Sequence, residues 1–176
     1  MKSLNFDLGV EEYLLAGKVA VSFNPTDMNF LERLASAFEE LDRIQEEGRA
    51  SREKITDDRE VFPVARELDG KMRAILNALF GKEICEPLFG GMNLFASSGG
   101  LPVWANLILA VTDEVQEAMQ GELDKREKRI AKYVAKYKTS PVGRGDSRNG
   151  ITTQLGYSLY IRLYARLTGG VRTCNS

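Results

Sequence analysis

Two amphipathic helical patterns separated by a glycine-rich connector constrain this chain more than any other feature. Apolar residues recur at three- and four-residue steps on both sides of the connector, and such spacing places them on one face of a helix. They are Val61, Ala65, Leu68, Met72, Ile75, Leu76 and Leu79 before it, and Trp104, Leu107, Ile108, Val111, Val115, Ala118 and Met119 after it. Between Gly81 and Pro102 the connector holds several glycines and prolines, which prevent one helix from running through it. We therefore expect two helices whose apolar faces meet each other.

The composition indicates one globular domain with an appended tail. The chain has 176 residues, of which 43% are hydrophobic, enough for one sizeable core. Its two cysteines are too few for a disulfide framework or a metal cluster, and histidine, the commonest general base and metal ligand, is absent. The N-terminus lacks an apolar core of signal-peptide length, and the longest apolar run, residues 101–111, is too short to span a membrane. We expect a cytoplasmic protein that contacts no membrane.

The N-terminal part predicts a β-hairpin followed by a helix. Alternation of apolar with polar or small residues predicts two strands, the first containing Leu4, Phe6 and Leu8 and the second Val19, Val21 and Phe23. After Asn24-Pro25, the residues Thr26, Asp27 and Asn29 are candidate helix caps, and Glu32 stands three residues after Asn29 as in a capping box. The helix is expected to run to about residue 47, where Gly48 ends it.

The rest of the core is expected to be helical. Residues 48–60 are charged and predict a solvated linker. Pro63 fits the first turn of a second helix that ends at Phe80-Gly81. A short helical turn around residues 83–85 and a loop through residue 98 lead to a last helix that starts at Pro102 and continues past Gly121. The predicted fold class is mainly α: a small helical domain with an N-terminal β-hairpin, a long basic C-terminal helix and a tail of uncertain order.

Charge is divided along the chain. Residues 1–120 contain 12 Lys and Arg against 21 Asp and Glu, net −9, whereas residues 121–176 contain 12 against 4, net +8. Lysines stop at Lys138, and this change in composition predicts a boundary between a domain at 1–138 and a tail at 139–176.

The basic segment around residues 122–138 carries the candidate partner-binding side chains. These are Lys125, Arg126, Arg129, Lys132 and Lys136. One interpretation is a nucleic-acid surface. The favoured interpretation is that the segment complements the acidic remainder of the chain or an acidic partner, because no stacking aromatic platform or nucleic-acid fold pattern accompanies it.

No motif predicts catalysis, a cofactor or a metal ion. The pairs Gly90-Gly91 and Gly99-Gly100 have neither Walker nor dinucleotide-binding spacing, which favours structural turns. Ser97-Ser98 has no candidate base nearby in sequence. Trp104 is interpreted as a core residue, with ligand stacking as the alternative. The sequence therefore offers no candidate catalytic, cofactor-binding or metal-binding residues.

Four strings carry a family resemblance that spans residues 1 to about 138. They are VSFNPTDMNFLERLASAFEELDRIQE, ELDGKMRAILNALFGKEICEPLFGGMN, GLPVWANLILAV and RIAKYVAKYK. The combination of FNPTD, the FG to LFG spacing and the basic K-Y-x-x-K-Y segment resembles the tail assembly chaperones of long-tailed phages and prophages of Firmicutes. The resemblance implies a non-enzymatic protein that binds the tape measure protein, keeps it soluble and extended, and supports assembly of the tail tube around it.

The tail has two interpretations. In many such chaperones a ribosomal frameshift near the end of the basic segment adds a piece that recruits the tail tube protein, so the resemblance implies that residues 139–176 are such an extension. A fortuitous tail is the alternative. Residues 139–150 have the composition of a flexible tether, and the alternation at residues 155–167 predicts a strand that can add to a sheet.

The sequence thus leads to two functional hypotheses. The first is a tail assembly chaperone, and the alternative is a basic-tailed nucleic-acid-binding regulatory protein. The oligomeric state, the client-facing apolar residues and the host are not specified by the sequence.

Overall fold

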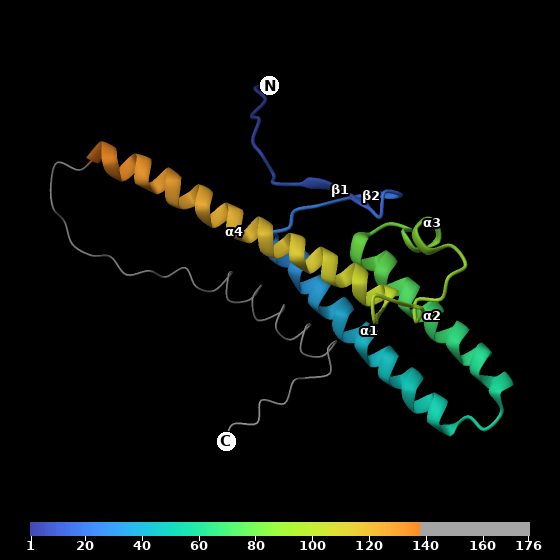
Figure 1. The fold of residues 1–176 in the computed structure, drawn as a ribbon. Coiled ribbons are helices and arrows are strands. Elements are labelled where there is room, and N and C mark those ends of the chain that lie inside the picture. The colour runs from blue at the N-terminus through green and yellow to red at the C-terminus, as the bar shows by residue number, and fades with distance from the viewer. Residues whose placement is uncertain (138–176) are drawn as a thin grey trace, which may run out of the picture. The chain divides into compact units, whose positions relative to one another are not determined.

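Helices dominate the chain in the computed structural model, which describes residues 1–137 (Figure 1). They are α1 (Met28–Lys54), α2 (Asp58–Phe80), α3 (Cys85–Phe89) and α4 (Val103–Tyr137). An antiparallel hairpin of β1 (Glu11–Leu15) and β2 (Val19–Phe23) precedes them. The predicted fold class is confirmed: mainly helical, with an N-terminal two-stranded hairpin and a long last helix. The chain divides into two units at Leu109 and Ala110.

The first strand of the hairpin was placed too early. Leu15 is paired with Val19 and Glu11 with Phe23, so residues 4–8 lie outside the paired strands. The cause is the turn: Ala16 and Gly17 have φ angles of 46° and 70°, the positive values typical of tight hairpin turns, and the chain reverses immediately before β2. The alternating residues Leu4, Phe6 and Leu8 are exposed.

The hairpin packs on the helices through the predicted face of β2. Val19, Val21 and Phe23 are buried, whereas Ala20 and Ser22 between them are exposed. The ring of Phe23 stacks on that of Phe30 in α1 with a centroid distance of 4.1 Å. Two lysines add ties, because Lys18 Nζ donates to the Leu88 carbonyl at 3.1 Å and Lys82 Nζ donates to the Ala20 carbonyl at 2.9 Å.

Helix α1 starts as predicted but runs further. Among the three candidate caps, Asp27 is the N-cap, and its carboxylate accepts from the Asn29 amide at 3.2 Å. Asn29 lies inside the helix, so the expected capping box at Asn29 and Glu32 was wrong. Gly48 does not end α1, which continues to Lys54. A Cβ at Gly48 would lie 3.2 Å from Leu68 Cδ1, so the glycine permits a close approach rather than a stop.

Helix α2 starts before the predicted position and ends at it. It begins at Asp58, capped by the Asp57 carboxylate, so Pro63 lies inside the helix rather than in its first turn. The predicted stop is confirmed at Gly81, which has left-handed backbone with φ 62°. The charged linker is reduced to residues 55–57, because α1 and α2 extend into it from both sides.

Helices α1 and α2 form the main helix pair, and Figure 1 shows them side by side. A connection this short makes successive helices antiparallel neighbours. Their facing sides are buried and contribute half of the buried apolar residues of this unit. The buried members are Phe30, Leu31, Leu34, Ala37, Phe38, Leu41 and Ile44 of α1, and Leu68, Met72, Leu76 and Leu79 of α2.

Trp104, at the start of α4, also packs against α1. Its ring centroid lies 6.2 Å from that of Phe38, and its Nε1 donates to Gln45 Oε1 at 3.1 Å. Trp104 is fully buried, which confirms its interpretation as a core residue. The expected pairing of the 61–79 face with the 104–119 face omitted α1, the helix that α2 contacts most.

The connector, residues 81–102, contains α3 and a second small hairpin. Helix α3 begins at Cys85, so the expected turn at residues 83–85 lies slightly too early. Strands β3 (Ser97–Ser98) and β4 (Leu101–Pro102) pair around Gly99 and Gly100, confirming the structural interpretation of that glycine pair. The last helix begins one residue after the predicted Pro102.

Helix α4 is continuous through Gly121, as predicted, and extends to Tyr137. Ile108, Val111, Val115 and Met119 are buried along it. The predicted tail at 139–176, with its tether and its strand at 155–167, lies outside the described residues. The predicted boundary near residue 138 therefore stays a prediction.

Candidate partner-binding surfaces

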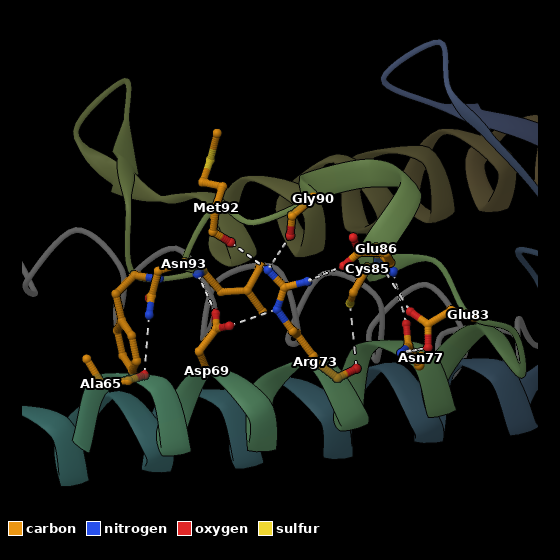
Figure 2. Close-up of polar contacts among 12 residues, drawn as sticks. Ala65, Asp69, Arg73, Asn77, Glu83, Cys85, Glu86, Gly90, Met92 and Asn93 are labelled. Atoms are coloured by element: carbon orange, nitrogen blue, oxygen red, sulfur yellow. Dashed lines mark hydrogen bonds and ion pairs between the residues drawn. The ribbon is translucent and has the colours of Figure 1, made fainter. Parts of the chain in front are cut away.

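A polar network on α2 fixes the connector, and Figure 2 shows its side chains. Arg73 Nε donates to Asp69 Oδ2 at 2.7 Å, while Arg73 Nη2 donates to the carbonyls of Gly90 at 2.9 Å and Met92 at 2.6 Å. The other oxygen of Asp69 accepts from the Leu94 amide at 2.7 Å. We call these groups the Arg73 network. One planar guanidinium thus satisfies two connector carbonyls that lie far from it in sequence.

The same helix also fixes the start of α3. Asn77 Oδ1 accepts from the amides of Ile84 at 2.9 Å and Cys85 at 3.0 Å, and Asn77 Nδ2 donates to Glu83 Oε2 at 2.7 Å. These bonds satisfy backbone donors that a helix start leaves without partners. Asp69, Arg73 and Asn77 stand four residues apart, so a single edge of α2 holds the connector.

The buried thiol of Cys85 is part of this packing. Its Sγ donates to the Arg73 carbonyl at 3.6 Å. Burial raises the pKa of the Cys85 thiol to about 11, with the nearby Glu83 and Asp69 carboxylates raising it further and the Arg73 guanidinium opposing them. The thiol is therefore protonated at neutral pH, which suppresses its nucleophilicity and metal binding.

An open groove lies between α1 and α2. It has a volume of about 560 Å³. Helix α2 contributes only apolar residues, Ala74, Ile75, Ala78 and Leu79, whereas α1 contributes Ala37 together with Glu32, Arg33, Ser36 and Glu40. We call this the α1–α2 groove. Its alanines allow close approach of a third backbone, and grooves between helices commonly accept an amphipathic helix.

The predicted partner-binding cations lie on α4. Lys125, Arg126, Arg129 and Lys132 are exposed, and Lys136 belongs to the last turns of the same helix. Spacing of three to four residues places Lys125, Arg129 and Lys132 on one side, which we call the basic face. Lys125 Nζ lies 2.8 Å from Glu122 Oε1, so at least one cation is paired within α4.

Exposed apolar residues share the C-terminal half of α4 with the basic face. Ile130, Tyr133 and Val134 keep about half of their surface accessible, with exposed fractions of 49%, 56% and 46%. Helical geometry places Tyr133 beside the basic face and places Ile130 and Val134 on the opposite side of α4. This end of α4 is therefore amphipathic and offers a second surface that a partner helix or strand can cover.

Sequence reasoning missed both the groove and the network. The signal for the groove was Ala74 and Ala78, four residues apart beside Ile75, which the helical pattern counted only as gaps in the apolar face. Asp69, Arg73 and Asn77 were visible at four-residue steps, but nothing in the sequence indicated that their partners were connector carbonyls and amides.

Two searches of residues 1–137 gave negative results. No group of three or more Cys, Asp or Glu side chains there is placed to hold a metal ion. Within the same range, no helix combines the length and the apolar character that a membrane crossing requires.

Comparison with known proteins adds no relative. No protein-family model matches the chain, no curated protein matches it, and no solved structure matches it. The evidence for a function is therefore the α1–α2 groove, the basic face and the family resemblance in the sequence.

Proposed function

We propose that this protein is a phage or prophage tail assembly chaperone that binds the tape measure protein and supports assembly of the tail tube. The observation that supports it best is the α1–α2 groove, an open groove along a helix pair whose α2 wall is apolar. A long amphipathic helical client needs such a surface, because its apolar face otherwise aggregates in water. The family resemblance over residues 1–138 supplies the identity of the client.

The proposed mechanism is reversible burial without covalent chemistry. The client helix lays its apolar face on the alanines and on Ile75, while the charged outer surfaces of α1 keep the complex in solution. Release requires only that tube subunits compete for the same client face. In this proposal residues 139–176 contact the tail tube protein.

Co-expression with the tape measure protein of the same phage tests the proposal. The expected result is that the client stays in the soluble fraction and co-elutes with this protein in gel filtration. The variant Ala74→Trp fills the groove and should lose the client, whereas Ala50→Trp, on the exposed surface of α1 outside the groove, should retain it. An equally insoluble client with and without this protein contradicts the proposal.

A nucleic-acid-binding regulator is the second candidate, and the exposed cations of α4 are the observation that favours it. Such binding weakens steeply with salt, since each neutralised phosphate releases counterions. Titration of double-stranded DNA between 50 and 200 mM salt, an interval over which several phosphate contacts lose orders of magnitude in affinity, distinguishes the two functions. The chaperone proposal expects no salt-dependent DNA binding.

A further inference from the structure

Two carboxylates on the α1–α2 groove form no ion pair within the part of the chain that the structure describes. Glu32 and Glu40 both line the groove from α1, and neither forms an ion pair with any residue in the range 1–137. Further along α1 the situation differs, because Glu46 pairs with Arg49 and Glu47 with Arg43 and Lys71. Glu46 and Glu47 are thus paired beyond the groove, whereas the two carboxylates along the groove are not.

The opposite wall of the groove cannot supply the missing cations. All four groove residues from α2 are apolar. Arg33 also lines the groove, but its guanidinium lies over the ring of Phe30, 5.8 Å from the centroid. An occupant must therefore bring its own positive charge to neutralise Glu32 and Glu40, and must keep that charge away from Arg33.

The spacing of the two carboxylates defines where those charges must stand. Glu32 and Glu40 are eight residues apart, which is about 12 Å along a helix axis. A helix lying along the groove has the same rise per residue, so two of its cations seven or eight residues apart reach both carboxylates from one side. Seven residues are close to two full turns, which keeps such cations beside a continuous apolar stripe.

We propose that the α1–α2 groove selects client helices that carry two Lys or Arg residues seven or eight positions apart along the border of their apolar face, one contacting Glu32 and the other Glu40. This inference rests on the proposed function and names the chemistry of the client segment. The apolar groove supplies affinity for any amphipathic helix, and the two carboxylates supply the register and the choice among helices.

Helix α4 of a second copy is the competing occupant. Lys125 and Lys132 are also seven residues apart, but Lys125 is already paired with Glu122. The structure therefore favours a separate client over self-association, and the test below includes the oligomeric state.

The test uses the full chain with Glu32→Gln and Glu40→Gln combined, against a matched control with Glu53→Gln and Glu60→Gln. Both variants remove two exposed carboxylates, and the control sites do not line the groove. Both should unfold at the wild-type denaturant midpoint, because these are surface positions. The groove variant should bind the tape measure protein about tenfold more weakly, as expected for two partly exposed ion pairs, and the control should bind normally.

A designed helical peptide with an apolar stripe and lysines seven residues apart serves as a second probe. Its comparison peptide has the same composition with both lysines moved to the opposite face. The wild-type chain should prefer the first peptide about tenfold, and the groove variant should bind both equally.

The outcomes separate the inference from the proposed function. A wild-type chain that fails to bind the tape measure protein contradicts the function itself. Binding by the wild type that survives Glu32→Gln and Glu40→Gln unchanged, or equal affinity for the two peptides, overturns the inference and leaves the function standing. A groove variant that changes the oligomeric state of the free chain overturns it in favour of a second copy.

Discussion

Two faces of helix α2 behave in opposite ways. The edge formed by Asp69, Arg73 and Asn77 is polar, and its groups are hydrogen-bonded to the connector. The face formed by Ala74 and Ala78 is apolar and exposed, and it borders the α1–α2 groove. One helix therefore carries a completed structural contact and an open surface within the same ten residues.

The difference separates residues that stabilise the fold from residues that are open to a partner, in a region with no candidate catalytic group. Polar groups that satisfy one another in a partly buried site stabilise the fold, because unmaking any of them leaves a desolvated partner. Exposed apolar surface beside unpaired carboxylates adds little to the stability of the free chain, and its burial by an occupant is favourable. The Arg73 network thus stabilises the connector, and the groove is the surface that is open to a partner.

Adjacent residues on α2 provide the test with the largest expected effect. Leu76 is fully buried, whereas Ile75 lines the groove and is only half-buried. We expect Leu76→Ala to lower the free energy of unfolding by roughly 2–5 kcal/mol, because it leaves a cavity in the core. Ile75→Ala should cost about 1 kcal/mol, because less apolar area returns to water.

Urea denaturation followed by circular dichroism measures both changes, and client binding at low denaturant gives the second readout. Ile75→Ala should weaken client binding, and Leu76→Ala should leave it unchanged in the folded fraction. Equal destabilisation by the two variants means that the groove is closed in solution, which removes the contrast between the two faces.

Much of the fold was predictable because periodicity reports burial. Leu68, Met72, Leu76, Trp104 and Ile108 were all assigned to apolar faces, and all are buried. One error shows a local signal that was overridden by a tertiary contact. Gly48 has the identity of a helix stop, but the approach of Leu68 to within 3.2 Å of its absent Cβ shows a packing role.

The hairpin shows a second limit, which is that the turn decides which residues can pair. Alternation at Leu4, Phe6 and Leu8 is a genuine strand pattern, but the turn at Ala16 and Gly17 sets which residues can pair. The candidate site was less predictable than the fold. The five cations of α4 could be read directly from the sequence, whereas the groove requires α1 and α2 to be neighbours, a long-range fact that periodicity does not contain.

The second prediction concerns the Arg73 network. Arg73→Met keeps the aliphatic stem but removes the bonds to the carbonyls of Gly90 and Met92 and leaves the Asp69 carboxylate without its cation. We expect a loss of about 1–3 kcal/mol in the free energy of unfolding. Arg73→Lys is the matched control and should recover only part of this, because an ammonium cannot reproduce the planar fork.

Hydrogen exchange localises this effect. The Leu94 amide, which donates to Asp69, should exchange faster in Arg73→Met, while amides in the middle of α1 should exchange as in the wild type at matched stability. Uniformly faster amide exchange across α1 and α2 contradicts a local role for the Arg73 network and makes it part of the global core.

The third prediction uses the buried thiol of Cys85, which lies in the connector. The pKa of Cys85 is about 11 in the fold against an ordinary value of 9.0. A group whose pKa is raised by folding contributes its stability fully below pH 9 and loses it as the pH rises toward 11. In a Cys174→Ser background, the stability advantage of Cys85 over Cys85→Ala should therefore shrink between pH 8 and pH 10.5.

Thiol labelling gives an independent measurement in the same background. At pH 8, iodoacetamide should react with Cys85 far more slowly in the native chain than in urea, because the native thiol is both buried and protonated. Equal labelling rates would place Cys85 in solvent and would contradict a closed connector.

The smallest expected effect tests which sides of the α1–α2 pair are open. A Cβ at Gly70 of α2 would meet nothing within 4 Å, whereas a Cβ at Gly48 of α1 would meet Leu68 Cδ1 at 3.2 Å and Phe95 Cζ at 3.6 Å. Alanine is favoured over glycine inside a helix by up to about 1 kcal/mol. Gly70→Ala should therefore stabilise the chain by about 0.5–1 kcal/mol, while at Gly48 the same gain is offset by crowding.

Gly48→Val should then be clearly destabilising, since larger groups in packed sites force neighbouring side chains to move. If both alanine variants raise the denaturant midpoint equally, the contact at Gly48 is loose, and α1 and α2 are held together only by the apolar residues that flank it.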